Sequence, residues 1–179
     1  MKSAYLLTGR PGVGKTTLIK EVVARLSRAC GGFYTEEIRV RGVREGFRIV
    51  ALDGEAAILA SVHICSSHRV SKYGVDVVAL ERVGVAALRT AMQEREVIVI
   101  DEIGKMELYS AGFREVVLEA IESGKPVMGT ILLGPHPWAD GIKRHPKVQL
   151  VYLTPANREQ VRGQLLGWLG ETGEKAIDT

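Results

Sequence analysis

Residues 9–16 read Gly9-Arg10-Pro11-Gly12-Val13-Gly14-Lys15-Thr16, and this stretch decides the fold of the 179-residue chain. It matches the pattern G-x-x-x-x-G-K-[ST] without a gap. In that pattern glycines let successive backbone N–H groups turn toward a phosphate, the lysine supplies a mobile cation, and the hydroxyl can ligate Mg²⁺. We therefore predict a phosphate-binding loop, here called the P-loop. Its nucleotide-binding residues are Gly9, Arg10, Pro11, Gly12, Val13, Gly14, Lys15, Thr16 and Thr17.

The segments on either side of the P-loop suit this prediction. Ala4-Tyr5-Leu6-Leu7 is short and apolar, as a buried parallel strand is. Apolar residues then recur at helical spacing from Leu18 to Leu26, with charged residues on the other side. Because Gly31-Gly32 follows, we expect this helix to end near Cys30. The motif thus follows a strand and opens a helix, whose N-terminus adds a positive end for a phosphate.

The rest of the chain alternates between apolar runs and helical patterns. These patterns predict strands over 97–100, 127–132 and 148–153, helices over 76–94, 110–123 and 155–169, and loops over 63–75 and 134–146. Between residues 33 and 62, short strands separated by Gly-containing turns indicate antiparallel hairpins. We therefore predict a single P-loop domain, residues 1–179. Its expected fold is a three-layer α/β fold with a mostly parallel central sheet and an added antiparallel hairpin.

The composition excludes several classes of protein. Hydrophobic residues make up 46% and charged residues 25% of the chain, unlike a disordered or collagen-like protein. The net charge of +3 is too small to indicate a nucleic-acid partner by itself, and no apolar run approaches the ~18 residues of a membrane span. Cys30 and Cys65 lie far apart, without a metal-binding spacing. We therefore expect a cytoplasmic monomer with two free thiols and no membrane partner.

A second acidic motif follows the apolar run Val97-Ile98-Val99-Ile100. Asp101 ends this predicted buried strand, where P-loop folds place a Mg²⁺ ligand, so we assign Asp101 and Thr16 to the metal. Glu102 leaves the strand and can act as a general base toward water that attacks the γ-phosphate. The alternative is that both acids cap the following helix, because acidic residues are favoured near helix N-termini. Their agreement with one nucleotide site favours the catalytic interpretation.

Six segments carry a resemblance that spans almost the whole chain in order. They are residues 9–18, 32–39, 46–53, 71–76, 100–107 and 157–158. Together they resemble the small P-loop nucleoside-triphosphatase family of the THEP type, which includes the cancer-related nucleoside-triphosphatase. The middle segments are more specific than the P-loop, which many families share. The chain shows no departure from the family at the P-loop or at Asp101-Glu102.

The resemblance implies hydrolysis of the terminal phosphate of ATP, GTP, CTP and UTP, with Mg²⁺ and little base preference. It also implies the branch of P-loop proteins in which a glutamate follows the strand-end aspartate. In that branch the strand of Asp101 does not pair with the P-loop strand, and the 127–132 strand lies between them. Thr130 would then be placed to sense the γ-phosphate or its water, the alternative being an ordinary strand threonine.

Three further charged residues have two interpretations each. Lys105 follows the acidic motif closely and can neutralise charge on the transferred phosphate in place of an arginine finger, or it is a solvated surface lysine. Glu36 and Glu37 end the second strand, at the rim where ligands bind in such sheets. Either can orient water or Mg²⁺, but ordinary salt bridges to Arg39 or Arg44 are the favoured interpretation.

Three residues are candidates for the nucleoside end of the substrate. Asn157 and Arg158 start the last predicted helix, near the expected position of the base or ribose. Alternatively, Asn157 only helps to close the first turn of the helix after Pro155. Trp138 can stack on a base, although a tryptophan in a Pro-rich loop more often packs the loop down.

Three functions are compatible with these motifs, and a Mg²⁺-dependent nucleoside-triphosphatase with Glu102 as base and Lys15 as phosphate clamp is favoured. The runner-up is a phosphotransferase acting on a nucleoside, a nucleotide or an RNA end, because the fold and the P-loop do not set the acceptor. A second pocket together with a lid would distinguish it. The chain lacks a long Arg-rich lid segment, although residues 33–62 and 63–75 are able to wall an acceptor pocket. The third is a slow nucleotide-driven switch that binds RNA or a protein, for which the sequence gives no sign.

Overall fold

The computed structural model describes residues 1–170; the end of the predicted domain, residues 171–179, lies outside the described residues. In chain order the strands and α-helices are β1 (Ala4–Thr8), α1 (Lys15–Arg25), β2 (Cys30–Val40), β3 (Val43–Ala51), β4 (Ala56–Ser61), β5 (Arg69–Val70), β6 (Tyr73–Val75), α2 (Val77–Leu80), α3 (Ala86–Glu94), β7 (Val97–Ile103), α4 (Ala111–Glu122), β8 (Val127–Ile131), α5 (Pro137–Lys143), β9 (Val148–Tyr152) and α6 (Arg158–Trp168). A π-helical stretch, Glu81–Val85, joins α2 and α3 into the continuous helix that the sequence predicts. A 3₁₀ turn, Glu107–Tyr109, lies between β7 and α4.

One mixed sheet runs through the molecule in the order β5-β6-β4-β3-β2-β7-β8-β1-β9. Its centre is parallel, because β2 pairs with β7, β7 with β8, β8 with β1, and β1 with β9. The strand β8 therefore separates the P-loop strand from β7, which confirms the order implied by the resemblance. Parallel strands end at one edge of a sheet, so the segments that follow β1 and β7 meet there.

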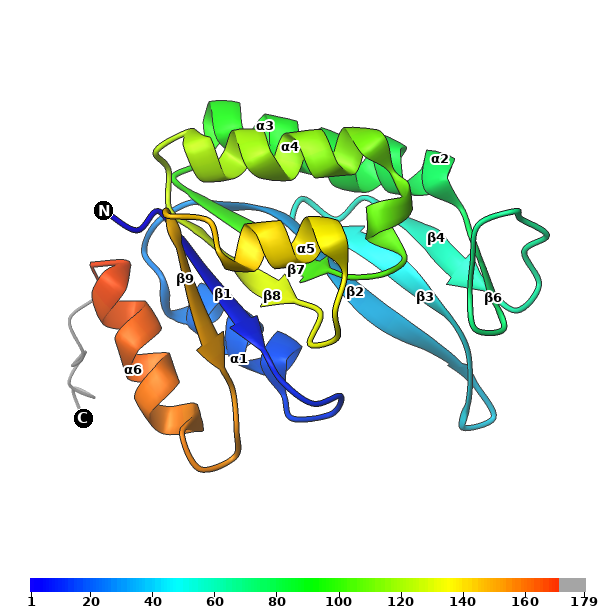
Figure 1. Cartoon of the computed structure of the whole chain (residues 1–179), viewed down its shortest axis with the longest axis horizontal. Coiled ribbons are helices and arrows are strands. Elements are labelled where there is room, and N and C mark those ends of the chain that lie inside the picture. Colours follow the sequence, from blue (N-terminus) through cyan, green and yellow to red (C-terminus); the bar gives the residue numbers. More distant parts are fainter. Residues whose placement is uncertain (171–179) are drawn as a thin grey trace.

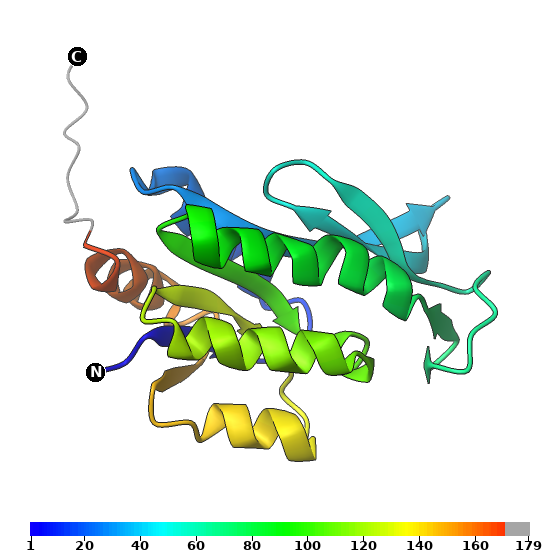
Figure 2. The ribbon, with the colours of Figure 1, turned by 90° about the horizontal axis from the view of Figure 1, so that it is seen from above.

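Helices cover both faces of the parallel centre and give the molecule three layers (Figures 1 and 2). The helices α3, α4 and α5 pack on one face, and α1 and α6 pack on the other. Alternation along β7 explains its unbroken apolar run: Ile98 and Ile100 face the first core, and Val97 and Val99 face the second. All four side chains are fully buried.

The antiparallel addition continues the parallel sheet beyond β2. This strand pairs with β7 through its first residues and with β3 along its length, and β3 pairs with β4. The predicted antiparallel hairpins between residues 33 and 62 are therefore confirmed. They place the far end of β2, together with β3, beyond the edge at which the P-loop lies, and so extend the wall of the site (Figure 1).

The predicted end of the first helix is wrong. The helix ends at Arg25, and residues 30–32 belong to β2 instead of to a helix stop. Gly32 has a φ of +114°, and a Cβ atom on it would lie 1.9 Å from the carbonyl oxygen of Val99. The glycines that suggested a helix end are therefore required where β2 packs closely against β7.

Two segments expected to be loops contain regular structure. Residues 134–146 include α5, which has Pro137 in its first turn and is capped by His136, whose Nδ1 accepts from the backbone N–H of Ala139. Residues 63–75 include the short strands β5 and β6, which pair with each other. Because β6 also pairs with β4, this segment adds to the edge of the sheet next to the hairpin.

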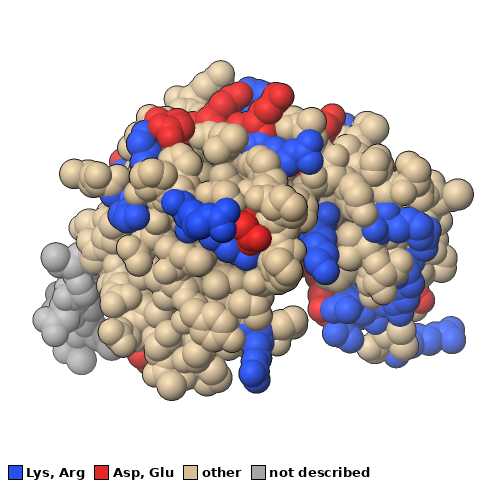
Figure 3. Space-filling view, viewed as in Figure 1, with Lys and Arg blue, Asp and Glu red and all other residues tan. Residues whose placement is uncertain are grey.

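The helices, the cysteines and the surface charges can be compared with the expectations drawn from composition. Within residues 1–170, no helix combines the length and the apolar character needed to cross a bilayer. Cys30 is partly buried, Cys65 is exposed, and both are free thiols. On the face seen in Figure 3, Lys and Arg side chains gather over the end of the molecule formed by the hairpin strands. The small net charge is therefore unevenly distributed.

Candidate active site

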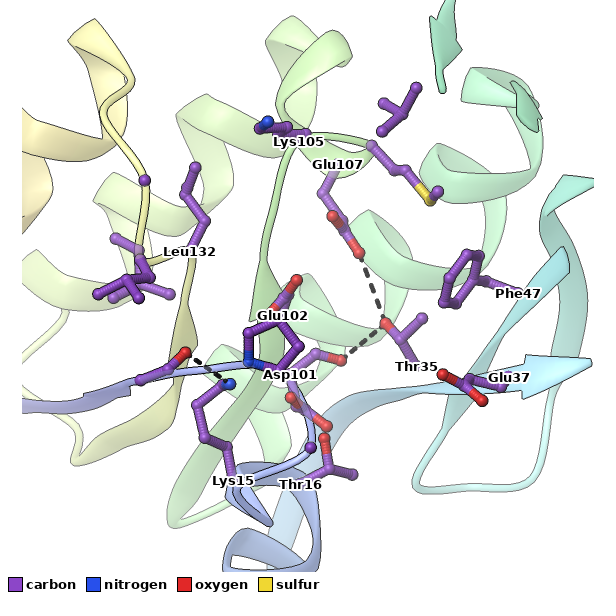
Figure 4. Close-up of a pocket in the computed structure, with 18 of the residues that line it drawn as sticks. Lys15, Thr16, Thr35, Glu37, Phe47, Asp101, Glu102, Lys105, Glu107 and Leu132 are labelled. Atoms are coloured by element: carbon purple, nitrogen blue, oxygen red, sulfur yellow. Dashed lines mark hydrogen bonds between the residues drawn. The ribbon is translucent and has the colours of Figure 1, made fainter. Parts of the chain in front are cut away.

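A cavity of about 650 Å³ opens beside the P-loop at the carboxyl ends of the parallel strands (Figure 4). The residues that line it are Gly9, Pro11, Gly12, Gly14, Lys15, Thr16, Thr17, Thr35, Glu37, Arg44, Phe47, Val70, Asp101, Glu102, Lys105, Met106, Glu107, Ile131, Leu132, Leu133 and Gly134. The structure thus brings the P-loop, the acidic motif and Lys105 together, although they are far apart in the sequence. The hairpin and β5 supply the opposite end of the cavity.

The P-loop connects β1 to α1 as its sequence pattern requires. Gly14 precedes α1 with a φ of +95°, a left-handed conformation that glycine adopts without strain. The ammonium of Lys15 donates to the backbone carbonyls of Gly9 at 3.0 Å and Arg10 at 3.1 Å, so it is held over the loop where a phosphate oxygen can replace them. Two predicted loop residues do not line the cavity: the Arg10 side chain is exposed, and Val13 packs against the core.

Asp101 is 2% exposed and lies where β7 passes beside β8. Its Oδ1 accepts a hydrogen bond of 2.6 Å from Thr130 Oγ1. Its Oδ2 is buried without a hydrogen-bond partner among the described residues, and the Thr16 hydroxyl lies close to this carboxylate (Figure 4). A buried, unpartnered carboxylate oxygen is costly, and a cation beside it removes that cost. Asp101 and Thr16 therefore fit a Mg²⁺ site, since Mg²⁺ prefers oxygen ligands.

Thr130 has a role that neither interpretation of the sequence included. It is fully buried on β8 and is not among the residues that line the cavity. Burial raises the pKa of Asp101, and the Thr130 and Thr16 hydroxyls act in the opposite direction by stabilising the carboxylate. Thr130 therefore holds the Asp101 carboxylate in position through its hydrogen bond to Oδ1.

Two more carboxyl groups share the cavity with Asp101. A Cβ atom on Gly104 would lie 2.6 Å from Glu102 Oε1 and 2.8 Å from Glu107 Oε2, so both side chains converge on this glycine. Burial and then the charge of Asp101 raise the pKa of Glu102, while Lys15 lowers it. Burial and then the charge of Glu102 raise the pKa of Glu107 to about 8. Both glutamates therefore hold a proton more tightly than an exposed glutamate does.

Glu107 is a candidate that the sequence patterns did not single out. It begins the 3₁₀ turn after β7 and is 3% exposed. Thr35 of β2 links it to the acidic motif, because Thr35 Oγ1 donates to the carbonyl of Asp101 at 2.9 Å and lies 3.5 Å from Glu107 Oε1. The sequence offers one sign of a buried glutamate here, because residues 106 and 108 on either side of Glu107 are apolar. This sign is weak, since the burial of the segment depends on tertiary packing.

Lys105 and Glu37 both line the cavity, but only Glu37 forms ion pairs with other described residues. Lys105 lies on the wall away from the P-loop (Figure 4), and its ammonium has no hydrogen-bond or ion-pair partner within residues 1–170. It is therefore available to a phosphate. Glu37 is paired with Arg39 at 2.7 Å and with Arg44 at 3.0 Å, which confirms the salt bridges favoured from the sequence.

Glu36 and Trp138 are not among the residues that line the cavity. Glu36 pairs with Arg48 at 2.7 Å and with Lys20 at 3.0 Å, different cations from those expected, and hydrogen bonds from Arg48 and then Lys20 lower its pKa. Trp138 belongs to α5 and is partly buried against the core beneath α3, α4 and α5. It packs its segment down, as the favoured interpretation expects.

The two residues predicted at the nucleoside end are bonded within the protein. Asn157 Oδ1 accepts from the backbone N–H of Thr154 at 2.8 Å, and its Nδ2 donates to the last carbonyl of β9 at 2.8 Å, so it closes the turn before α6. Arg158 donates to the carbonyl of Gly14 at 3.1 Å and to Glu21 at 2.8 Å. Arg158 thus attaches α6 to the P-loop from outside, and neither side chain lines the cavity.

Comparisons with known proteins identify the relatives of this chain. A family model described as NTPase matches residues 4–166. Nucleoside-triphosphatase THEP1 of Thermotoga sp. (strain RQ2) is 48% identical, over 95% of this chain and 98% of the relative. The crystal structure of THEP1 from Aquifex aeolicus aligns with a TM-score of 0.83 and 40% identity, over 93% of this chain and 98% of that one. The solution structure of a human cancer-related nucleoside triphosphatase aligns with a TM-score of 0.79 and 33% identity, over 97% and 100%. The chain therefore belongs to this family of nucleoside-triphosphatases.

Proposed function

We propose that the protein hydrolyses ATP, GTP, CTP and UTP to the diphosphate and phosphate in a Mg²⁺-dependent reaction. One observation carries the proposal: the P-loop, the unpartnered Oδ2 of Asp101 and the carboxylate of Glu102 share one cavity. Together they supply a cradle for phosphates, a cation site and a base, which are the parts that phosphoryl transfer to water needs. The relatives' name, nucleoside-triphosphatase, supports the same reaction.

Each charged group in the cavity has a task in this proposal. The P-loop backbone and Lys15 would bind the β- and γ-phosphates. Asp101 and Thr16 would hold Mg²⁺, which when bound neutralises charge on the phosphate oxygens. Lys105, on the other wall, would add a second cation at the γ-phosphate. The two lysines would therefore stabilise the negative charge on the phosphate oxygens during the reaction.

Glu102 is the group that we propose activates water. It accepts a proton from the water whose oxygen bonds to the γ-phosphorus, while the bond from that phosphorus to the bridging oxygen breaks and the diphosphate leaves. A raised pKa suits a base that works near neutral pH. Glu36, the other acid considered, has a lowered pKa and two cationic partners, so it is a weaker base.

Low base preference and the state of the chain belong to the same proposal. The polar groups of Asn157 and Arg158 form hydrogen bonds within the protein. Fewer polar groups are therefore left to distinguish one base from another. We place the whole chain, residues 1–179, as one monomeric domain in the cytoplasm, where its two free thiols are stable.

Phosphate release from the four nucleoside triphosphates, with Mg²⁺ and with EDTA, tests the proposal. We expect similar rates for the four and loss of activity with EDTA. The variant Glu102→Gln is expected to keep nucleotide binding and to lower kcat by at least ~10²-fold. Glu36→Gln is the matched control, because it removes a carboxylate that lies outside the cavity. A Glu102→Gln variant with the wild-type kcat would overturn the assignment of the base.

A further inference from the structure

A second cavity, of about 540 Å³, adjoins the active-site cavity on its hairpin side. The residues that line it are Arg39, Val43, Arg44, Phe47, Val70, Ser71, Lys72, Tyr73 and Met106. Four of them also line the active-site cavity: Arg44, Phe47, Val70 and Met106. The second cavity therefore begins where the first one ends, beyond the P-loop. Its volume lies within the range of small-molecule sites, roughly 300–1,000 Å³.

The second cavity is basic. Arg39, Arg44 and Lys72 line it, and no carboxylate is among its lining residues. Glu37, which pairs with both arginines, lines only the active-site cavity, and the ammonium of Lys72 has no hydrogen-bond or ion-pair partner in the described part of the chain. The basic side chains of Figure 3 gather over this end of the molecule. The charge of the cavity therefore favours an anionic ligand.

Arg44 is held in a fixed orientation between the two cavities. Its Nε donates to the hydroxyl of Tyr73 at 3.0 Å, and its Nη1 donates to Glu37 Oε1 at 3.0 Å. Its guanidinium carbon lies 5.2 Å from the centre of the Phe47 ring. A guanidinium fixed through two of its N–H groups presents the others in a defined direction, which is the arrangement that recognises a phosphate.

Apart from Ser71, the rest of the second cavity is aromatic and apolar. The rings of Phe47 and Tyr73 meet edge to face, with centres 5.3 Å apart and planes at 75°. Val70 and Met106 complete this surface, and the ammonium of Lys72 lies 5.6 Å from the centre of the Tyr73 ring. Such a surface packs against a planar ring. Cations beside it suit a ligand that carries both a ring and a phosphate.

We propose that the second cavity binds a phosphate monoester of a ring compound and that this ligand accepts the γ-phosphoryl group. The proposal rests on the triphosphate site proposed above. An anionic oxygen of the monoester bonds to the γ-phosphorus, the bond from that phosphorus to the bridging oxygen breaks, and its electron pair stays with the nucleoside diphosphate. No proton moves in this step. The acceptor therefore does not need Glu102, whereas water does.

Calorimetric titration of the protein loaded with Mg²⁺ and β,γ-imido-ATP tests binding. The probes are AMP, GMP, CMP and UMP. Two fragments serve as controls: adenosine lacks the phosphate, and ribose 5-phosphate lacks the base. We expect saturable binding of the monophosphates and at least ~10-fold weaker binding of either fragment, the scale of one charged hydrogen bond or one stacked ring. A loaded protein that binds no monophosphate would overturn the proposal.

Two variants locate the binding. Lys72→Ala removes a cation that lines only the second cavity and is expected to weaken monophosphate binding about 10-fold. Arg89→Ala is the matched control, because Arg89 is an exposed cation on α3 paired with Glu119. Equal affinities in the two variants would contradict the placement of the ligand in this cavity.

Transfer is measured with γ-³²P-ATP and each monophosphate. We expect label in the nucleoside diphosphate, and we expect Glu102→Gln to lower phosphate release by at least ~10²-fold while it retains transfer. Label that reaches only free phosphate, although the monophosphate is bound, would overturn the acceptor role. Failure of the proposed hydrolysis is a separate result, because it shows as absent phosphate release by the wild-type protein without any monophosphate.

Discussion

Asp101, Glu102 and Glu107 are three carboxyl groups in one small region, and burial raises the pKa of each while different neighbours act on it. Asp101 accepts a hydrogen bond from the Thr130 hydroxyl on Oδ1, and its buried Oδ2 has no hydrogen-bond partner among the described residues. Glu107 is enclosed, and Glu102 lies beside Lys15, which favours its charged form. The charges of Glu102 and Asp101 add to the effect of burial and raise the pKa of Glu107 further.

Glu107→Gln should make the stability of the fold depend less on pH. The folded-state pKa of about 8 lies above the ordinary value of 4.5, so the folded chain binds this proton more tightly than the unfolded chain. The resulting stabilisation is complete below about pH 4.5 and is lost as the pH rises to about 8. In urea titrations with EDTA, the free energy of unfolding of the variant is expected to fall less over this range. Parallel pH profiles for the two proteins would contradict the buried proton.

Lys105→Ala should lower kcat by about 10²-fold and change KM less, because the cation acts on charge that develops in the transition state. Lys105→Arg should restore part of the rate. Lys125→Ala is the control, since Lys125 lies before β8, at the opposite edge of the sheet, and donates to the carbonyl of Arg95. Steady-state kinetics with MgATP measure the effect. An unchanged kcat in Lys105→Ala would leave Lys105 as a solvated surface residue.

At the scale of single residues, local pattern predicted part of the site. The P-loop could be predicted because it follows an apolar strand, and Asp101-Glu102 because it follows the apolar run 97–100 within β7. Glu107 could not, because its burial depends on a 3₁₀ turn that packs beside Thr35 of a distant strand. The bonds of Arg158 to Gly14 and Glu21 are also long-range, so the position of Arg158 in the chain did not indicate them.

At the scale of elements, α6 supports the P-loop through one side chain. Arg158→Ala removes the hydrogen bond to the Gly14 carbonyl, so we expect Mg²⁺-nucleotide to bind at least ~5-fold more weakly, with a loss of stability of about 1–3 kcal/mol. Arg162→Ala is the control, because Arg162 pairs with Glu21 and Glu159 on the same helix without touching the loop. Binding of a fluorescent nucleotide measures both variants. Equal affinities would show that α6 does not support the loop.

The elements predicted correctly are those with local signals. The helix α4 begins where Ser110 Oγ accepts from the backbone N–H of Phe113, a cap that the sequence displays. The end of α1 was misplaced because Gly32 is required by its contact with Val99, which is distant in the sequence. The sequence contains a start signal for α5, because Pro137 follows the capping residue His136. The surrounding Pro, Gly and His residues nevertheless favoured a loop.

At the scale of the whole molecule, the site exists only where several segments meet, so a ligand should stabilise the entire fold. We expect Mg²⁺ with β,γ-imido-ATP at 100 times its Kd to add about 2.7 kcal/mol, which corresponds to a rise in Tm of about 5–10 °C. EDTA should reduce the rise. Lys15→Ala should abolish it, because the loop loses its phosphate cation. A thermal scan measures the shift, and an equal shift in Lys15→Ala would contradict the role of the P-loop.

The arrangement of the whole molecule was only partly predictable. The place of β8 between β1 and β7 follows from the resemblance, whereas the second cavity needs the structure. Residues 33–62 and 63–75 do wall this cavity, as the phosphotransferase interpretation requires. Its chemistry depends on Arg44 and Lys72 meeting the rings of Phe47 and Tyr73, and no spacing in the sequence indicates this.

The position of β1 between β8 and β9 also has a consequence for synthesis of the protein. The P-loop strand comprises residues 4–8, but its two neighbours are residues 127–131 and 148–152. On the ribosome this strand is synthesised early, and its two partner strands are synthesised much later. It therefore stays unpaired through most of translation, as is typical of long-range sheet pairing. A nascent chain shorter than about 158 residues also lacks the Arg158 bond to the loop. We therefore expect a nascent chain to bind nucleotide only after the late strands β8 and β9 have been made.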